Sequence, residues 1–164
     1  MFGKAPFVLY MLVVALFLAN EPANAQEDRE AILAKVQQFF DALEKSDTVA
    51  GREAVLLDGQ YFRLRDVGDS LDLVRTPHTA FLSSLAAGGR DFLERMWDPT
   101  VLQHGRMAVV WTPYDFYRAG EFSHCGVDVF NLIRTDVGWR ISGIMYTVEP
   151  TGCEPSPLGP PGGP

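Results

Sequence analysis

The order of hydrophobic patterns along the chain is the feature that most restricts its fold. Between residues 28 and 45 the apolar positions recur every three or four residues, which predicts an amphipathic helix: Ile32, Val36, Phe39, Phe40 and Leu43. After Gly89 the pattern changes to long runs of aromatic and β-branched residues separated by short turns, which is typical of an antiparallel meander. This order predicts an α+β fold, in which a curved antiparallel sheet of four long strands wraps around the long N-terminal helix.

Two shorter helices and two short strands complete the predicted order. We expect the second helix at residues 48–57 and short strands at 61–65 and 71–74. Thr76-Pro77 resembles a helix cap followed by a first-turn proline, so a third helix is expected from there to Gly88-Gly89. The four long strands are expected at residues 92–103, 107–118, 121–134 and 139–148.

The N-terminal residues have the pattern of a signal peptide. Lys4 precedes an apolar run at residues 7–19, interrupted only by Tyr10, and Ala23-Asn24-Ala25 offers the small residues that a signal peptidase cleaves after. The run is shorter than the roughly 20 residues that span a bilayer. We therefore predict a signal peptide at residues 1–25 and a periplasmic or secreted protein. Membrane contact is expected only through this segment, if it stays uncleaved as an anchor.

Length and charge limit what the rest of the chain can do. The 164 residues allow one ordinary domain, predicted at 26–150, followed by a Pro/Gly-rich tail at 151–164 that we expect to be disordered. With 14 Lys+Arg against 21 Asp+Glu, the formal charge is −7. Nucleic acid binding draws on clustered basic residues, so we expect no nucleic acid partner.

The two cysteines have two interpretations. In an oxidising compartment Cys125 and Cys153 can form one disulfide; alternatively, Cys125 is a buried thiol of a strand and Cys153 a thiol of the tail. The three histidines lie far apart and lack the spacing of a metal motif. We expect neither a metal nor another cofactor.

Three segments carry a resemblance to a known superfamily: residues 32–43 (ILAKVQQFFDAL), residues 111–117 (WTPYDFY), and residues 129–134 (VFNLIR) with Gly138-Trp139-Arg140-Ile141. On these residues the chain from Asp28 to Val148 resembles the NTF2-like superfamily, the cone fold of SnoaL-like and ketosteroid isomerase-like proteins. The resemblance implies a conical cavity for a small apolar or aromatic molecule, and a possible homodimer formed through the sheet. It does not assign a reaction, because the superfamily includes isomerases, dehydratases, cyclases and binding proteins.

Strand alternation and turn length determine which polar residues meet. A two-residue turn at Ala119-Gly120 sets Asp115 opposite His124, whereas a three-residue turn with a bulge sets Tyr114 there. If Arg134 pairs with Trp139 in the last hairpin, Met145 falls opposite Asp128 and Glu149 opposite His124. The first turn would make an acid–histidine pair that either transfers protons or only satisfies buried polar groups.

The candidate site follows from these alternations. His124, Asp115 and Asp128 are the candidate catalytic residues. The candidate ligand-binding residues are Trp111, Tyr114, Tyr117, Phe130 and Tyr146. We expect an exported protein with a cavity for a small molecule and a noncatalytic binding or accessory role. The alternative is a cofactor-independent isomerase, dehydratase or cyclase with a His/Asp acid–base pair, so the sequence leaves open whether the protein is an enzyme.

Overall fold

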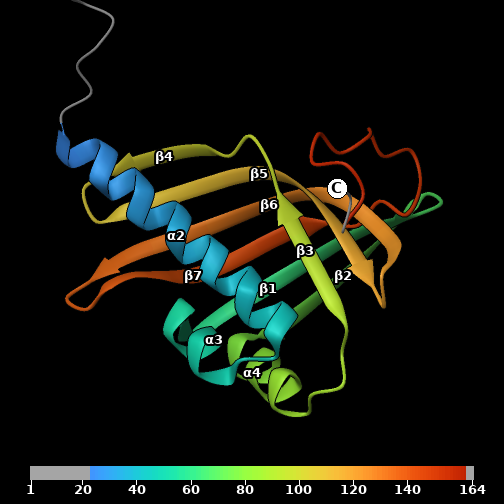
Figure 1. The fold of residues 1–164 in the computed structure, drawn as a ribbon, viewed down its shortest axis with the longest axis horizontal. Helices are drawn as coiled ribbons and strands as arrows, with labels where there is room; N and C mark the ends of the chain where they lie inside the picture. The colour runs from blue at the N-terminus through green and yellow to red at the C-terminus, as the bar shows by residue number, and fades with distance from the viewer. Residues whose placement is uncertain (1–22, 162–164) are drawn as a thin grey trace, which may run out of the picture.

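The computed structural model describes residues 23–161, which form three helices and a seven-stranded sheet (Figure 1). The predicted signal peptide lies outside the described residues except for Ala23 to Ala25, which begin the first helix. The helices are α2 (Ala23–Lys45), α3 (Thr48–Ala54) and α4 (His78–Ala86). The strands are β1 (Val55–Val67), β2 (Ser70–Pro77), β3 (Phe92–Met96), β4 (Thr100–His104), β5 (Met107–Arg118), β6 (Glu121–Thr135) and β7 (Gly138–Thr147).

The sheet has the order β2-β1-β7-β6-β5-β3, with β4 also paired to β5. The C-terminal meander β5-β6-β7 is antiparallel, as the sequence predicts. Strand β1 pairs in parallel with β7, so the sheet as a whole is mixed. Hydrophobic alternation does not carry the direction of a strand, and the sequence therefore did not reveal this pairing.

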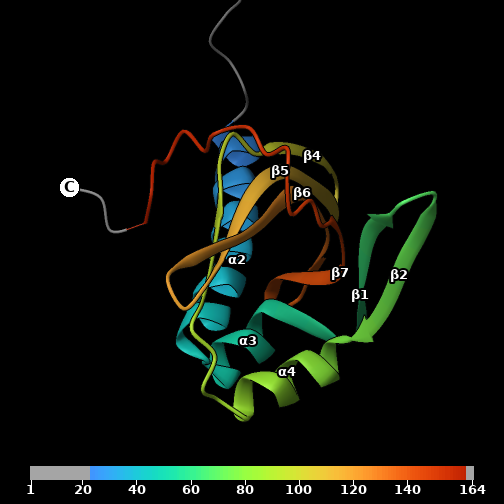
Figure 2. The same ribbon diagram turned by 90° about the vertical axis from the view of Figure 1, so that its right-hand side faces the viewer.

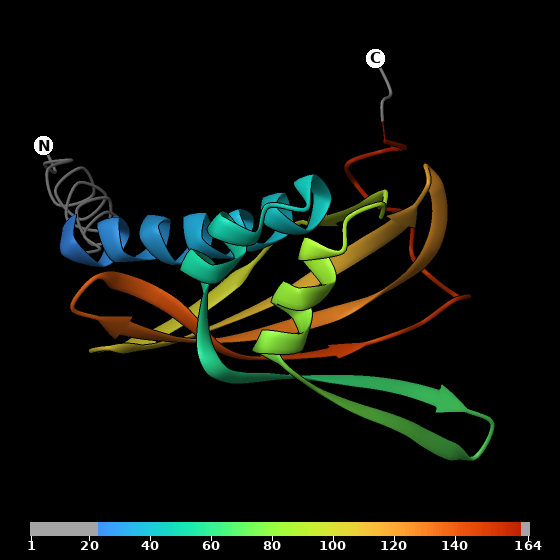
Figure 3. The ribbon, with the colours of Figure 1, turned by 90° about the horizontal axis from the view of Figure 1, so that it is seen from below.

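The long helix α2 lies across the concave face of the curved sheet, and α3 and α4 cover one end of that face (Figures 2 and 3). The predicted apolar stripe of α2 faces the sheet, with Ile32 and Val36 fully buried. The Phe40 ring packs edge-on against Phe130 of β6, with 5.6 Å between the ring centroids. These contacts confirm the predicted α+β architecture with a helix inside a curved sheet.

Two predicted helix boundaries are wrong where a helix meets a strand. The second helix ends at Ala54, because the chain enters β1 at Val55. The third helix begins at His78, since Thr76 and Pro77 still pair with β1 at the end of β2. Helical and strand patterns overlap at such junctions, where the tertiary pairing decides.

The predicted strand at 92–103 is two strands that both pair with β5. Met96 of β3 lies opposite Tyr114, and Thr100 of β4 lies opposite Trp111. The chain leaves the sheet between them, where Asp98 has φ 45° and Pro99 lacks a backbone donor. The interruption separates β3, which forms one edge of the sheet, from β4.

A disulfide joins Cys125 of β6 to Cys153, which confirms the predicted pairing over two free thiols. Their Cα atoms are 6.0 Å apart, and Cys125 exchanges two backbone hydrogen bonds with Glu149. Further along the tail, Arg95 donates a hydrogen bond to the Gly159 carbonyl. Between residues 23 and 161, no helix is long and apolar enough to cross a membrane.

Candidate functional site

A β-bulge in the β5-β6 hairpin decides which residues meet at the site. The turn at Ala119-Gly120 has two residues, as predicted, because Arg118 pairs with Glu121. The register then shifts between Phe116 and Tyr117, so that Phe116 lies opposite His124. Both predicted registers are wrong, since neither Asp115 nor Tyr114 lies opposite His124. One extra residue in a strand reverses the alternation beyond it.

Asp115 lies on the opposite face of the sheet from His124. It pairs with Cys125 across the strands, and Arg95 holds its carboxyl with hydrogen bonds from Nε at 2.9 Å and from Nη2 at 2.5 Å. Asp115 is 2% exposed, so this ion pair is buried. The predicted acid–histidine pair of Asp115 and His124 is therefore not assembled.

A second bulge shifts the last hairpin. Arg134 pairs with Trp139 as predicted, but the register changes between Asn131 and Leu132. Tyr146 rather than Met145 therefore lies opposite Asp128. Likewise Glu149 bridges to Cys125 and not to His124. The prediction that His124 lies between two carboxylates is therefore wrong. A one-residue bulge shifts the register here, as it does for the predicted pair of Asp115 and His124.

A cavity of about 590 Å³ lies between α2, α4 and the concave face of the sheet. Its apolar wall comes from both layers and includes Phe39, Phe81, Phe92, Phe116, Phe130 and Ile144. A volume of this size is in the range that holds a small organic molecule, about 300 to 1,000 Å³. The aromatic part of this wall suits the apolar or aromatic part of a ligand.

The five predicted ligand-binding residues divide among three places. Phe130 and Tyr146 line the cavity. Tyr114 is fully buried beside it and donates a hydrogen bond from its hydroxyl to the Thr147 carbonyl at 2.7 Å. Trp111 and Tyr117 share the face of Asp115 and do not line the cavity; Trp111 is 54% exposed. Alternation within the strand put Trp111 and Tyr117 on the face of Asp115, as the structure has them, but the register that would align this face with His124 and Phe130 is not formed.

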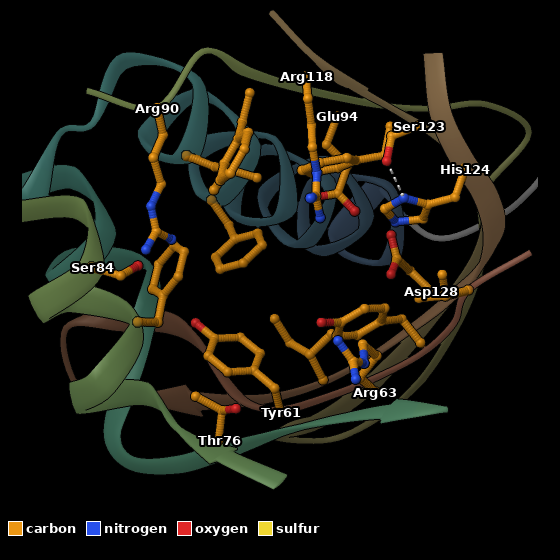
Figure 4. A pocket seen from close by; sticks show the side chains of 18 of the residues that line it. Tyr61, Arg63, Thr76, Ser84, Arg90, Glu94, Arg118, Ser123, His124 and Asp128 are labelled. Atoms are coloured by element: carbon orange, nitrogen blue, oxygen red, sulfur yellow. Dashed lines mark hydrogen bonds between the residues drawn. The ribbon is translucent and has the colours of Figure 1, made fainter. Parts of the chain in front are cut away.

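His124 lines the cavity next to a serine that the bulge brings to the same side. Its Nδ1 lies 3.0 Å from Ser123 Oγ (Figure 4). Burial, together with the charges of Arg118, Arg63 and Arg65, lowers the pKa of His124 to about 4. The imidazole is therefore neutral at physiological pH, whereas the predicted carboxylate neighbour would have favoured the imidazolium.

Two carboxyl groups, Glu94 of β3 and Asp128 of β6, meet in the cavity (Figure 4). Burial raises the pKa of Asp128 well above its usual range, and the neighbouring Glu94 raises it further. Burial also raises the pKa of Glu94 to about 8, although hydrogen bonding to Asp128 opposes part of this shift. Both groups are mainly protonated at pH 7, so they act there as hydrogen-bond donors.

Three buried polar atoms of cavity-lining residues have no hydrogen-bond partner among the described residues: the Tyr61 hydroxyl, Arg63 Nε and Asp128 Oδ2. Tyr61 is 8% exposed and Asp128 2% exposed. Buried polar groups in folded proteins nearly always have a partner. A ligand or ordered water in the cavity would satisfy these atoms.

Sequence reasoning missed Glu94, Tyr61 and the arginines of the cavity. Glu94 had a visible signal, because it alternates with the apolar Phe92 and Met96 on one face of a strand. Tyr61 and Arg63 lie on β1, which reaches the cavity only through its pairing with β7. Within residues 23–161, no three His, Cys, Asp or Glu side chains come together as a metal site.

The geometry defines an α+β cone with one cavity wall formed by helices and the other by a curved sheet. Several solved structures with this architecture are described as NTF2-like proteins. An NTF2-like protein with a cystatin-like fold from Novosphingobium aromaticivorans is 18% identical, with a TM-score of 0.57, covering 89% of this chain and 92% of its own. A protein of unknown function from Mycobacterium tuberculosis is 15% identical with a TM-score of 0.63, covering 85% and 79%.

A proposed dehydratase of the NTF2-like family from Streptomyces avermitilis is 17% identical with a TM-score of 0.59, covering 76% of this chain and 97% of its own. No family model and no curated protein matches the sequence. The fold is therefore NTF2-like, as the sequence resemblance implied. At these identities the likeness concerns the fold and leaves the function open.

Proposed function

We propose that this chain is an exported protein whose cavity binds a small apolar or aromatic molecule, in a binding or accessory role without catalysis. The observation that carries the proposal is the set of three unpartnered buried atoms at the cavity wall: the Tyr61 hydroxyl, Arg63 Nε and Asp128 Oδ2. Desolvating such groups without a partner costs about 1–3 kcal/mol each. A bound molecule that hydrogen-bonds to them offsets this cost.

Two features support export. The N-terminal pattern of residues 1–25 matches a signal peptide, and the Cys125–Cys153 disulfide fits an oxidising compartment. N-terminal sequencing of protein from the periplasm or culture medium tests this directly. We expect the mature chain to begin at Gln26, and retention of residues 1–25 in a membrane fraction would contradict it.

Binding is favoured over catalysis because the titratable groups at the cavity are not prepared to accept protons near pH 7. Glu94 and Asp128 are mainly protonated there, and His124 is a weak base with a pKa of about 4. An efficient general base has a pKa near the working pH. These groups are better suited to donate or accept hydrogen bonds than to remove a proton.

One observation favours a second candidate, a cofactor-independent dehydratase or isomerase. The pKa of Glu94 is about 8, which suits a general acid at neutral pH, and His124 lines the same cavity. In this version Glu94 replaces Asp115 as the acid of the pair. Turnover of the bound molecule, abolished by Glu94→Gln, would establish catalysis and overturn the noncatalytic role.

The test is native mass spectrometry of protein purified from its own host, which should show a copurifying small molecule. Ala80 lines the cavity from α4, so Ala80→Trp should fill it and abolish the added mass. The neighbouring Thr79 is exposed and does not line the cavity, so Thr79→Trp should retain the ligand. An identical spectrum for the wild type and Ala80→Trp would contradict binding in this cavity.

A further inference from the structure

The cavity of this acidic protein is lined by four arginines, Arg63, Arg65, Arg90 and Arg118. The whole chain has a net charge of −7, so the basic lining is opposite in sign to the rest of the molecule. Glu94 and Asp128 are the two carboxyl groups of the same wall. The net charge of the cavity lining depends on whether these two acids are ionised and neutralise the arginines.

Most of these arginines lack a carboxylate partner. Arg63 forms an ion pair with Asp72, at 2.7 Å between Nη2 and Oδ2. Within the described residues no carboxylate lies in ion-pair distance of Arg65, Arg90 or Arg118. Three guanidinium charges therefore border the cavity without a fixed counter-ion.

Arg118 is held over aromatic rings instead of a carboxylate. Its guanidinium carbon lies 5.6 Å from the centre of the Phe92 ring and 5.7 Å from that of Phe116. Figure 4 shows its side chain extending into the cavity on the side of Glu94 and Ser123. Such stacking orients the planar group and leaves its N–H donors available for a carboxylate.

The acids of the wall do not neutralise this charge. Burial keeps Glu94 and Asp128 mainly protonated at pH 7, as their raised pKa values indicate. The lowered pKa of His124 is consistent with a positive electrostatic potential in the cavity, since the charges of Arg118, Arg63 and Arg65 all contribute to this shift. The end of the cavity at His124 is thus positive and rich in hydrogen-bond donors.

We propose that the ligand of this cavity is an aromatic carboxylate, with its rings against the phenylalanine wall and its carboxylate bound by Arg118. This inference rests on the proposed binding function and adds the chemical class of the ligand. The protonated Glu94 and Asp128 and the Tyr61 hydroxyl supply further donors beside the anion. A neutral ligand would leave the guanidinium groups of Arg65, Arg90 and Arg118 without a counter-ion.

Isothermal titration calorimetry with matched probes tests the charge requirement. The probes are benzoate, 2-naphthoate and biphenyl-4-carboxylate, each compared with its neutral primary amide at pH 7. We expect at least one carboxylate to bind about tenfold or more tightly than its amide, since hydrogen bonds to charged groups are the stronger ones. Added salt should weaken the carboxylate and leave the amide unchanged.

Variants assign the effect to Arg118. Arg118→Gln should weaken binding of the carboxylate about tenfold and binding of the amide less than about threefold. Arg65→Gln is a second test variant at the same end of the cavity, beside His124. Arg75→Gln is the matched control, because Arg75 is an exposed arginine of β2 that does not line the cavity. Circular dichroism checks that each variant is folded.

The outcomes separate the two proposals. If the amides bind as tightly as the acids, or if Arg118→Gln and Arg65→Gln leave the preference intact, the carboxylate inference is wrong while the binding cavity stands. If copurification shows a bound molecule that carries no anionic group, the inference is likewise overturned. If no probe binds and no molecule copurifies, both proposals fail.

Discussion

Ser123 and His124 point to the same side of β6, although they are neighbours in a strand. The bulge opposite Phe116 places both in the cavity, with His124 Nδ1 3.0 Å from Ser123 Oγ. In a regular strand, successive side chains face opposite sides. The bulge therefore builds a local hydroxyl–imidazole contact at the basic end of the cavity.

The first prediction concerns the protonation of His124. Its pKa is lowered to about 4 by burial and by nearby arginines, so the imidazole should stay neutral as the pH falls from 8 to 5. Nitrogen-detected NMR of the imidazole should give a midpoint near pH 4, and Arg118→Gln should raise it. A midpoint close to 6.5 in the wild type would contradict the basic environment.

The second prediction concerns Glu94 and stability. The pKa of Glu94 is raised from 4.5 to about 8, so between these values the folded state binds more protons than the unfolded state. Its contribution to stability is complete below pH 4.5 and is lost as the pH rises toward 8, at up to about 1.4 kcal/mol per pH unit.

Urea unfolding at pH 5 and pH 8 measures this contribution. Glu94→Gln keeps the shape of the protonated acid. The free energies of unfolding of the variant and the wild type should therefore be closer at pH 5 than at pH 8, and the variant should be the more stable of the two at pH 8. Asp128 changes stability in the same direction, and the difference between the variant and the wild type isolates Glu94. Equal pH slopes for both proteins would refute the prediction.

The third prediction concerns the buried ion pair of Arg95 and Asp115. Arg95→Met leaves the Asp115 carboxyl, which is 2% exposed, without its partner. We expect a loss of about 3–5 kcal/mol in the free energy of unfolding. The exposed pair Arg106–Asp136 is the control, and Arg106→Met should cost less than about 1 kcal/mol. Similar losses for the two variants, measured by urea unfolding, would show that burial does not set the difference.

The fourth prediction concerns the disulfide. Cys125 and Cys153 are separated by 28 residues, and closing a loop of that length stabilises the folded state by roughly 3–4 kcal/mol in the chain-entropy model. The double variant Cys125→Ser/Cys153→Ser should lose about this amount in urea unfolding without a reductant. Peptide mapping under nonreducing conditions supplies the control, and two free thiols in exported wild-type protein would disprove the bridge.

Much of the architecture could be predicted from the residues alone because hydrophobic periodicity reports local structure directly. The stripe that contains Val36 and Phe40 predicted a long helix on the core, and the runs after Gly89 predicted the meander. The Cys125–Cys153 bridge was one of two interpretations that an exported chain allowed. Each of these features depends on residue type and short-range spacing.

The site depended on longer-range geometry. Alternation correctly placed His124, Asp128 and Phe130 on one face, but a one-residue bulge separated His124 from Asp115. Register is a tertiary property, because one extra residue moves every later side chain to the other face. The sequence by itself thus determined the fold class and the shared face of the regular strand segment that contains His124, Asp128 and Phe130. Only the tertiary structure decided which face meets the helices, and brought Glu94 of β3 and the arginines of β1 and β5 to the same cavity.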